Sequence, residues 1–289
     1  MSIRTDIICR LIADNDIEQV VDCLERGFPE RSRAYWTDGI SRMSQRETIG
    51  DFPRYGYCLR TSERIVGVVL LIYSRRGAQG GAIQCNLSSW CVDEEYRTHA
   101  LALHMMAVKR KETTYLNISP AAHTRPTMEA LGFRRFSNGQ MFFAPALSRA
   151  ERDIRVCAFA ADAPEAMLLS QHERQVLTEH AAWGCRALIC VKDGFAYPFV
   201  FQHRKIVRGL IACPQLVYCR SLDEFVRFSG AIGRHFFFRM GPFCRVDAIA
   251  PIGGLVGRYF PKREPKYFKG PDPPGLSDLS YTELVIFGP

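Results

Sequence analysis

The sequence predicts an α/β (α+β) protein made of two mixed-sheet domains in tandem, the second a degenerate copy of the first. The chain has 289 residues, which is enough for two domains of ordinary size. Short apolar, β-branched segments alternate with helical segments in both halves, as in a mixed α/β sheet. Because the polar segment "SRAERD" separates the halves, we expect one domain at residues 1–149 and the other at residues 150–289.

The first half is expected to have the order β-α-α-β-β-β-α-β-α-β-β. A strand in residues 6–16 leads into a helix that Asp14 or Asp16 can cap, and a second helix follows the possible cap Ser32. A hairpin with its turn at Thr61–Arg64 comes next. The later elements are expected as a strand at 83–93, a helix at 98–110, a strand at 113–119, a helix at 123–133 and a hairpin at 134–147 that turns at Asn138-Gly139.

The second half repeats this pattern of strands, helix, strand and closing strands. A strand over 154–159 and a helical stretch over 163–184 precede strands within 185–204 and 209–219. A helix over 222–240 leads to a strand over 243–250, and the tail from residue 254 is expected to end on a strand after a Pro/Gly-rich loop. We interpret this half as a diverged structural repeat of the first, although no residue pattern recurs at a fixed offset.

The composition is that of an ordinary globular protein, with 47% hydrophobic, 24% charged and 11% aromatic residues. Residues 1–20 lack a basic segment followed by a long apolar run, and no stretch of roughly 18 apolar residues occurs. The 11 cysteines form no CxxC pair and lack the spacing of a metal site. We therefore expect a cytoplasmic protein with reduced cysteines, no bound metal and no membrane partner.

The net charge of +8 is divided equally between residues 1–150 and 151–289. The densest basic stretch is "PKREPKYFKG", and no lysine- and arginine-rich run of the nucleic-acid-binding kind occurs. Diffuse positive charge favours a small anionic ligand through long-range attraction. We expect no nucleic-acid partner, and the oligomeric state is left open.

One segment, Trp90–Ala107, runs from an apolar strand through an acidic turn into a helix. Together with "RIVGVVLLIYSRR" and "TTYLNISPAAHTRPTMEALGFRRFSNG", it resembles the GNAT superfamily of acyl-CoA-dependent N-acyltransferases over residues 3–147. Members of that superfamily carry V-x-P-E-x-R/Q-x-x-G-x-G/A at this junction and L-G-F further on. The matching positions are Val92, Glu94 or Glu95, Arg97, Ala102 and Leu131–Phe133. Ala100 stands where the first glycine belongs.

The resemblance implies that acetyl-CoA or another acyl-CoA is the co-substrate, bound through its pyrophosphate at this turn. Free N–H groups at a helix N-terminus favour such an anion, small side chains let the backbone approach it, and Arg97 adds a cationic fork. An ordinary strand–turn–helix junction is the alternative. The expected cofactor-binding residues are Cys91, Val92, Arg97, Thr98, His99, Ala100, Leu101, Ala102 and Asn117.

The catalytic groups are less well specified by the sequence. Acyl transfer to an amine needs a base for the ammonium proton, a donor that polarises the thioester carbonyl and often an acid for the thiolate. Met128 and Ala121 stand where superfamily members often have a tyrosine and an asparagine. The remaining candidates are His123, Tyr115 and Ser119, on or just after the strand expected to face the acyl group. For His123 the alternative is a helix-start residue bonded to the backbone.

The resemblance implies an acyl-CoA-dependent N-acyltransferase, with acetyl transfer to a small amine acceptor as the expected reaction. A catalytically inactive acyl-CoA-binding or scaffold protein of the same fold is the alternative, because fold does not imply activity. The chain as a whole is also similar to bacterial double-GNAT proteins in which the second copy lacks the cofactor motif. In agreement with this, nothing at the start of "LDEFVRFSGAIGRHF" reads as R-x-x-G-x-G.

Overall fold

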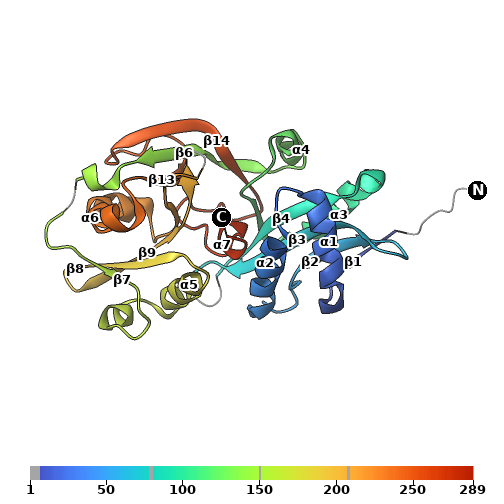
Figure 1. Cartoon of the computed structure of the whole chain (residues 1–289), viewed down its shortest axis with the longest axis horizontal. Coiled ribbons are helices and arrows are strands. Elements are labelled where there is room, and N and C mark those ends of the chain that lie inside the picture. Colours follow the sequence, from blue (N-terminus) through green and yellow to red (C-terminus); the bar gives the residue numbers. More distant parts are fainter. Residues whose placement is uncertain (1–6, 78–80, 150, 207–208, 289) are drawn as a thin grey trace, which may run out of the picture. The chain divides into compact units, whose positions relative to one another are not determined.

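The chain forms two compact units in the computed structural model, which describes residues 7–77, 81–149, 151–206 and 209–288 apart from the side chains of residues 238–240. Figure 1 follows the elements along the chain. The first unit consists of Met1–Ile118, Lys269–Asp272 and Tyr281–Phe287, and the second of Ser119–Phe268, Pro273–Ser280 and Gly288–Pro289. The predicted domain boundary falls at residue 150, which lies outside the described residues, so this boundary stays a prediction.

The first unit is built on strands in the order β1-β2-β3-β4-β5. Neighbouring strands are antiparallel from β1 to β4, and β5 runs parallel to β4. The strands are β1 Ile8–Leu11, β2 Gly56–Arg60, β3 Ile65–Arg75, β4 Ile83–Val92 and β5 Thr114–Asn117. The helices are α1 Ile17–Gly27, α2 Arg33–Gln45, α3 Ala100–Ala107 and, from the C-terminal residues, α7 Glu283–Ile286.

Local sequence explains these elements. All residues of β3 except the last are buried, as expected for the apolar run "IVGVVLLIY" at the centre of a sheet. The predicted cap Ser32 is confirmed, because its Oγ accepts the backbone N–H of Tyr35 at 3.3 Å and so starts α2. The predicted hairpin is also confirmed, with the N–H of Thr61 donating to the carbonyl of Arg64 across its turn.

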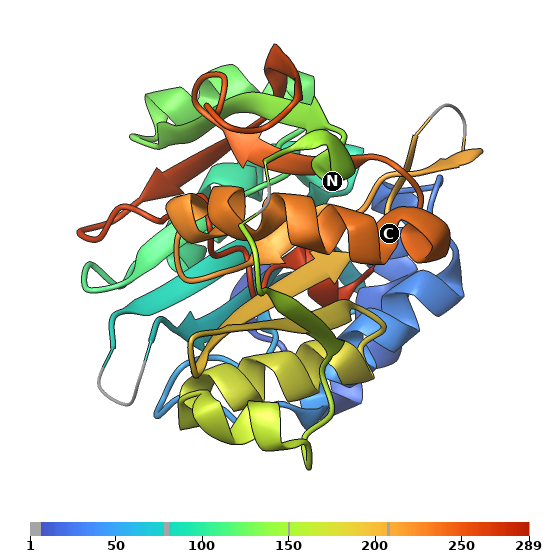
Figure 2. The ribbon, with the colours of Figure 1, turned by 90° about the vertical axis from the view of Figure 1, so that its left-hand side faces the viewer.

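The second unit has its strands in the order β14-β6-β13-β12-β9-β8-β7. These strands are β6 Arg134–Phe143, β7 Arg155–Ala158, β8 Arg186–Lys192, β9 Phe195–Gln202, β12 Gln215–Tyr218, β13 Cys244–Ala248 and β14 Gly257–Lys269, while β10 Lys205–Ile206 and β11 Ile211–Ala212 form a small separate sheet. The helices are α4 Arg125–Ala130, α5 Gln171–Ala182 and α6 Leu222–Met240. Figure 2 shows α6 lying across the strands, and its phenylalanines Phe225, Phe228 and Phe236 form one buried cluster with residues of β6, β8, β9, β12 and β13.

The predicted structural repeat is visible in the strand order. In the first unit β1 to β4 are antiparallel neighbours, α3 lies between β4 and β5 in the chain, and β5 is parallel to β4. In the second unit β7, β8, β9 and β12 are antiparallel neighbours, α6 lies between β12 and β13, and β13 is parallel to β12. The α/β (α+β) mixed-sheet fold class is therefore confirmed, and the same strand order occurs in both units.

The hairpin predicted over residues 134–147 is wrong, because residues 134–143 form the single strand β6 and Pro145–Leu147 form a 3-10 helix. Gly139 lies inside this strand and pairs with Ala248 of β13 on one side and Pro261 of β14 on the other. A Cβ at Gly139 would lie 2.3 Å from the carbonyl oxygen of Phe260. The glycine therefore serves the close approach of β14 rather than a turn.

The strand predicted at the end of the tail is also wrong, because Glu283–Ile286 form the short helix α7. This helix packs on α2 within the first unit. The ring of Phe287 lies 5.6 Å from that of Trp36 and 5.7 Å from that of Tyr35, and Arg42 donates to the carbonyl of Ile286 at 3.0 Å. Packing against a preformed helix thus overrides the β-branched composition of "ELVIF".

This packing predicts a large response to one added methyl group. A Cβ at Gly39 of α2 would lie 2.0 Å from the Phe287 ring, so Gly39→Ala must displace the tail and is expected to cost about 1–3 kcal/mol of unfolding free energy. Gly253→Ala is the matched control, because a Cβ there meets nothing within 4 Å. Thermal unfolding of both variants tests this. Equal melting temperatures would contradict the placement of Phe287.

A buried polar cluster lies in the second unit around Asp247. The Asp247 carboxylate pairs with the ammonium of Lys266 at 3.1 Å and accepts the side-chain amides of Gln140 at 3.1 Å and Gln215 at 2.9 Å. The side chains of Asp247 and Lys266 are 0% and 1% exposed. Complete burial of a paired charge needs this many partners, because each ion loses its hydration on folding.

Candidate functional site

The central feature of the first unit is a gap between β4 and β5. The two strands pair in parallel only from Gln84–Asn86 to Thr114–Leu116, and β4 then continues to Val92. No other strand of the described chain pairs with β4 on the side of β5. Unpaired backbone N–H and C=O groups at the edge of a strand can form hydrogen bonds with another extended chain. Residues 88–92 therefore offer an open edge to which an extended ligand can bind.

A bulge in β4 lies on this open edge. Leu70 of β3 pairs with Ser88 and Val68 pairs with Cys91, so one residue of β3 opposes two residues of β4. Ser89, inside the bulge, has a φ of 54°, which is uncommon for a residue with a side chain. A bulge re-aims backbone N–H groups out of the regular ladder, so this site can present a donor to a ligand in the gap.

The closed end of the gap is tied together by Asn86, which is buried. Its side-chain amide donates to the carbonyls of Leu87 at 3.1 Å and of Leu116, on β5, at 3.2 Å. Its Oδ1 accepts the backbone N–H of Glu283 at 2.6 Å. Asn86 thereby joins β4, β5 and the C-terminal residues at the point where the strands separate. Sequence reasoning missed it, although a polar residue within the apolar run "IQCNL" was a usable signal.

At the other end of β4, a 3-10 helix at Glu94–His99 leads directly into α3. Ala100 has a φ of −59° and a ψ of −38°, ordinary right-handed helical values. The glycine expected from the resemblance is therefore not needed for its backbone freedom here. The alanine keeps the start of α3 small, and Leu101 and Ala102 after it are exposed.

Two charged residues of the turn, Asp93 and Arg97, differ in how firmly their side chains are held. Asp93 is tied down by Arg26, at 3.0 Å, and by Arg64, at 3.3 Å. Arg97 is 69% exposed and its nearest acidic partner is Glu94 at 3.6 Å, a surface contact that holds it weakly. Its guanidinium is therefore accessible next to the start of α3.

Cys91 and Val92 form the end of β4, and both are half-buried. The Cys91 thiol points to α1, with its Sγ 3.8 Å from the carbonyl oxygen of Cys23. The pKa of Cys91 is raised well above its usual value, mainly by a hydrogen bond with the Cys23 thiol and secondly by burial. Cys91 is therefore a protonated packing residue at neutral pH, and it is suited to line the site rather than to act as a nucleophile.

Helix α3 is anchored by His104, which is 1% exposed and packs its ring on Trp90 of β4 with 5.0 Å between centroids. The pKa of His104 is lowered to about 4, mainly because the imidazole is buried and secondly because of the positive charge of Lys269. The imidazole is neutral at physiological pH and acts as a packing residue under the start of the candidate site.

The three catalytic candidates lie in different surroundings. Tyr115 is buried, its hydroxyl accepts the backbone N–H of Arg110 at 3.2 Å, and burial raises its pKa to about 12. Ser119 and His123 are exposed and belong to the second unit, with His123 in a 3-10 turn. In the first unit, residues 91–102 run from the end of β4 into α3, and the half-buried Asn117 follows Leu116 at the closed end of the gap. Tyr115 is the most buried of the three catalytic candidates.

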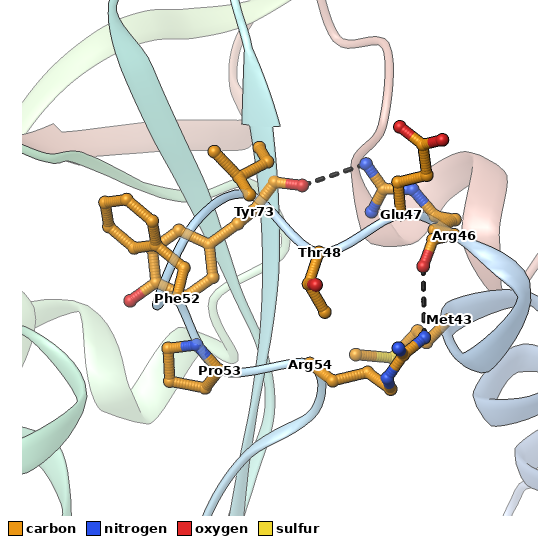
Figure 3. A pocket seen from close by; sticks show the side chains of 9 residues that line it. Met43, Arg46, Glu47, Thr48, Phe52, Pro53, Arg54 and Tyr73 are labelled. Atoms are coloured by element: carbon orange, nitrogen blue, oxygen red, sulfur yellow. Dashed lines mark hydrogen bonds between the residues drawn. The ribbon is translucent and has the colours of Figure 1, made fainter.

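A shallow pocket lies elsewhere in the first unit, shown in Figure 3. Its wall includes two guanidinium groups, those of Arg46, which donates to the carbonyl of Tyr73 at 2.8 Å, and of Arg54, which donates to the carbonyl of Arg46 at 3.1 Å. Tyr73 pairs with Cys85 near the start of β4, seven residues before Val92. At a rise of about 3.3 Å per residue, the pocket is roughly 25 Å along the strand from the turn at Asp93.

Three further properties concern the described residues only. In this part of the chain, no three histidine, cysteine or acidic side chains are grouped so that they could hold a metal ion. None of its helices combines the length and apolar character needed to cross a membrane. All 11 cysteines are free thiols, eight of them buried and three half-buried.

Comparison with known proteins depends on structure alone, since no family model and no curated protein matches the sequence. A GCN5-related N-acetyltransferase from Anabaena variabilis ATCC 29413 matches with a TM-score of 0.60 at 10% identity, over 91% of this chain and 72% of that one. One from Kribbella flavida matches with a TM-score of 0.58 at 12% identity, over 93% and 72%. Eis1 from Mycobacterium abscessus matches with a TM-score of 0.52 at 9% identity, over 91% and 73%.

At such low identities the likeness concerns the fold. It agrees with the strand order, the gap between two parallel strands and the helix that follows it in the first unit. The chain has the GNAT fold, that of the GCN5-related N-acetyltransferases, as the sequence predicted.

Proposed function

We propose that the protein is an acyl-CoA-dependent N-acyltransferase that transfers an acetyl or similar acyl group to a small amine. The observation that carries this proposal is the open edge of β4, which joins the bulge at Ser89 to the start of α3. An extended, amide-containing arm such as that of coenzyme A can pair with such an edge as a strand does.

The residues at both ends of this edge fit the two ends of the ligand. At the start of α3 the helix dipole favours a pyrophosphate, and Ala100, whose own N–H donates to the carbonyl of Arg97, is small enough to let it approach. Arg97 is accessible there for a charged hydrogen bond. At the bulge, a backbone N–H can polarise the carbonyl of the thioester. The residues that would hold the ligand are those expected from the sequence, Cys91, Val92, Arg97 to Ala102 and Asn117.

Acyl transfer from the thioester to an amine needs side chains mainly for proton transfer. The amine nitrogen forms a bond to the acyl carbon while the carbon–sulfur bond breaks, the amine gives up a proton, and the sulfur leaves with the bonding electrons and takes up a proton. His123 and Ser119, both exposed, remain the proton carriers expected from the sequence, because an imidazole or a hydroxyl can pass a proton between an amine and solvent. Tyr115 is poorly suited to this role because burial holds its phenol protonated and away from the surface.

A non-catalytic acyl-CoA-binding protein is the second candidate. It is favoured by Met128, which is fully buried and stands where superfamily members often have a tyrosine. Release of free coenzyme A separates the two candidates. Acetyl-CoA incubated with the full chain and a panel of primary amines, analysed by mass spectrometry, gives free coenzyme A and an acylated amine only if the protein is an enzyme.

Arg97→Ala is expected to weaken coenzyme A binding by about 1.5–3 kcal/mol, because a charged hydrogen bond to phosphate is lost. Titration calorimetry with coenzyme A measures this directly. Lys111→Ala is the matched control, since it removes one exposed positive charge of the same unit outside the turn. Equal affinities of wild type and Arg97→Ala would remove Arg97 from the site, and a wild type that does not bind would reject the proposed function.

A further inference from the structure

The second unit contains a second strand gap, equivalent to the first in its construction. Its parallel strands β12 and β13 pair only at Gln215 and Arg245, beside a bond from the N–H of Arg245 to the carbonyl of Pro214 at 2.9 Å. At the closed end, the side-chain amide of Gln215 reaches across to Asp247 on β13. Asn86 reaches across to Leu116 in the same way in the first unit.

Beyond this closed end, the C-terminal segment of the chain pairs with β12. The N–H of Leu279 donates to the carbonyl of Val217 at 2.7 Å, and the N–H of Cys219 donates to the carbonyl of Ser277 at 2.9 Å. Asp278 forms an antiparallel bridge with Tyr218 between these two bonds. Since β9 pairs with the opposite edge of β12, both edges of this strand are hydrogen-bonded.

The segment is held in place by its own side chains as well. Leu279 is 1% exposed, so its side chain is packed in the interior. The Asp278 carboxylate accepts both the backbone N–H and the hydroxyl of Ser280, which closes a turn directly after the bridge. A segment that is hydrogen-bonded in this way and anchored by the buried Leu279 does not leave its partner strand without a cost in free energy.

The helix that follows this gap is also unsuited to a polyphosphate. At the N-terminus of α6 the hydroxyl of Ser221 accepts the N–H of Glu224 at 3.2 Å, so one of its free donors is already used. Asp223 and Glu224 place two carboxylates in the first turn of α6 itself, whereas the two carboxylates before α3, Glu94 and Glu95, lie at the far end of the preceding 3-10 helix. The negative charges of these carboxylates repel a phosphate and oppose the attraction of the helix dipole.

We propose that residues 277–279 are a built-in occupant of the gap between β12 and β13, which closes the second unit to extended ligands. Among the described residues, one open strand gap then remains, that of the first unit, and the protein binds one molecule of acyl-CoA. The evidence that residues 277–279 close this gap comes from contacts within the second unit alone. The identity of the ligand that the first unit binds rests on the proposed function.

Hydrogen–deuterium exchange of the full chain, with and without saturating coenzyme A, tests this proposal. In the free protein the amides of Cys219 and Leu279 are expected to exchange at least about a hundredfold more slowly than in an unstructured peptide. Coenzyme A is expected to protect residues 88–100 and to leave residues 217–219 and 277–279 unchanged. Loss of protection at 277–279 on adding coenzyme A, or a stoichiometry of two per chain, would overturn the closure.

The two proposals fail in different ways. If coenzyme A changes no amide, the proposed function is rejected, while the exchange rates of Cys219 and Leu279 in the free protein still decide the closure. Leu279→Pro removes the N–H that bonds Val217, and it is expected to raise the exchange rate of Cys219 at least about tenfold. Leu279→Met, which keeps the N–H, serves as the control. Rapid exchange of Cys219 in the wild type, or an unchanged rate in Leu279→Pro, would contradict the proposal.

Discussion

Asp247→Asn is expected to destabilise the protein by about 3–5 kcal/mol, because it leaves the ammonium of Lys266 buried without its carboxylate. The two side chains are 0% and 1% exposed and lie 3.1 Å apart, so water cannot replace the lost charge. The substitution also turns an acceptor of the Gln140 and Gln215 amides into a group that donates from one side. Because asparagine has nearly the volume of aspartate, no cavity contributes to the loss.

Urea unfolding followed by circular dichroism measures this effect. The control is Asp22→Asn, which removes a carboxylate from an exposed ion pair with Arg33 and is expected to leave the unfolding midpoint nearly unchanged. A double variant, Asp247→Leu with Lys266→Met, is expected to recover part of the loss, since two apolar side chains can replace a buried ion pair. If Asp247→Asn unfolds at the same urea concentration as the wild type, the pair is not buried as described.

Elements with a strong local pattern could be predicted from the sequence. Helix α6 spans Leu222–Met240, the segment identified from its sequence, because the helical pattern and its start are both encoded locally. The Asn138-Gly139 pair shows the opposite case. Its local turn preference loses to two strands, β13 and β14, that flank it from more than a hundred residues away. Such long-range pairing leaves no mark within a short window of sequence.

In the candidate site, too, the locally encoded part could be predicted from the sequence and the part that depends on long-range contacts could not. Residues 91–102 are contiguous, so their strand, turn and helix could be read from the sequence together. The face of β5 could not, because alternation groups Tyr115 with Asn117 without saying which face is buried. Tyr115 points inward to Arg110. The contact between Asn86 and Glu283 joins residues almost two hundred positions apart, and only the folded chain shows it.

His104 is expected to make the stability of the protein fall steeply between pH 6.5 and pH 4. Burial, and then the charge of Lys269, lower the pKa of its imidazole to about 4 in the folded state, against about 6.5 in the unfolded chain. Between these two values the unfolded chain binds a proton that the folded protein does not, so acid favours unfolding and stability rises with pH. A pKa shift of this size corresponds to about 3 kcal/mol of unfolding free energy. This contribution to stability is fully present above pH 6.5 and is lost by pH 4.

The measurement is the free energy of unfolding of wild type and His104→Phe at a series of pH values. Phenylalanine keeps a ring against Trp90, whose centroid lies 5.0 Å from that of His104, but it does not titrate. The difference between the two proteins is therefore expected to be constant above pH 6.5 and to change by about 3 kcal/mol towards pH 4, in favour of the variant. His104→Leu, which removes the aromatic contact as well, is expected to shift the whole curve without restoring the pH dependence. A wild type and a His104→Phe variant with parallel curves would show that the imidazole is hydrated rather than buried beneath the start of α3.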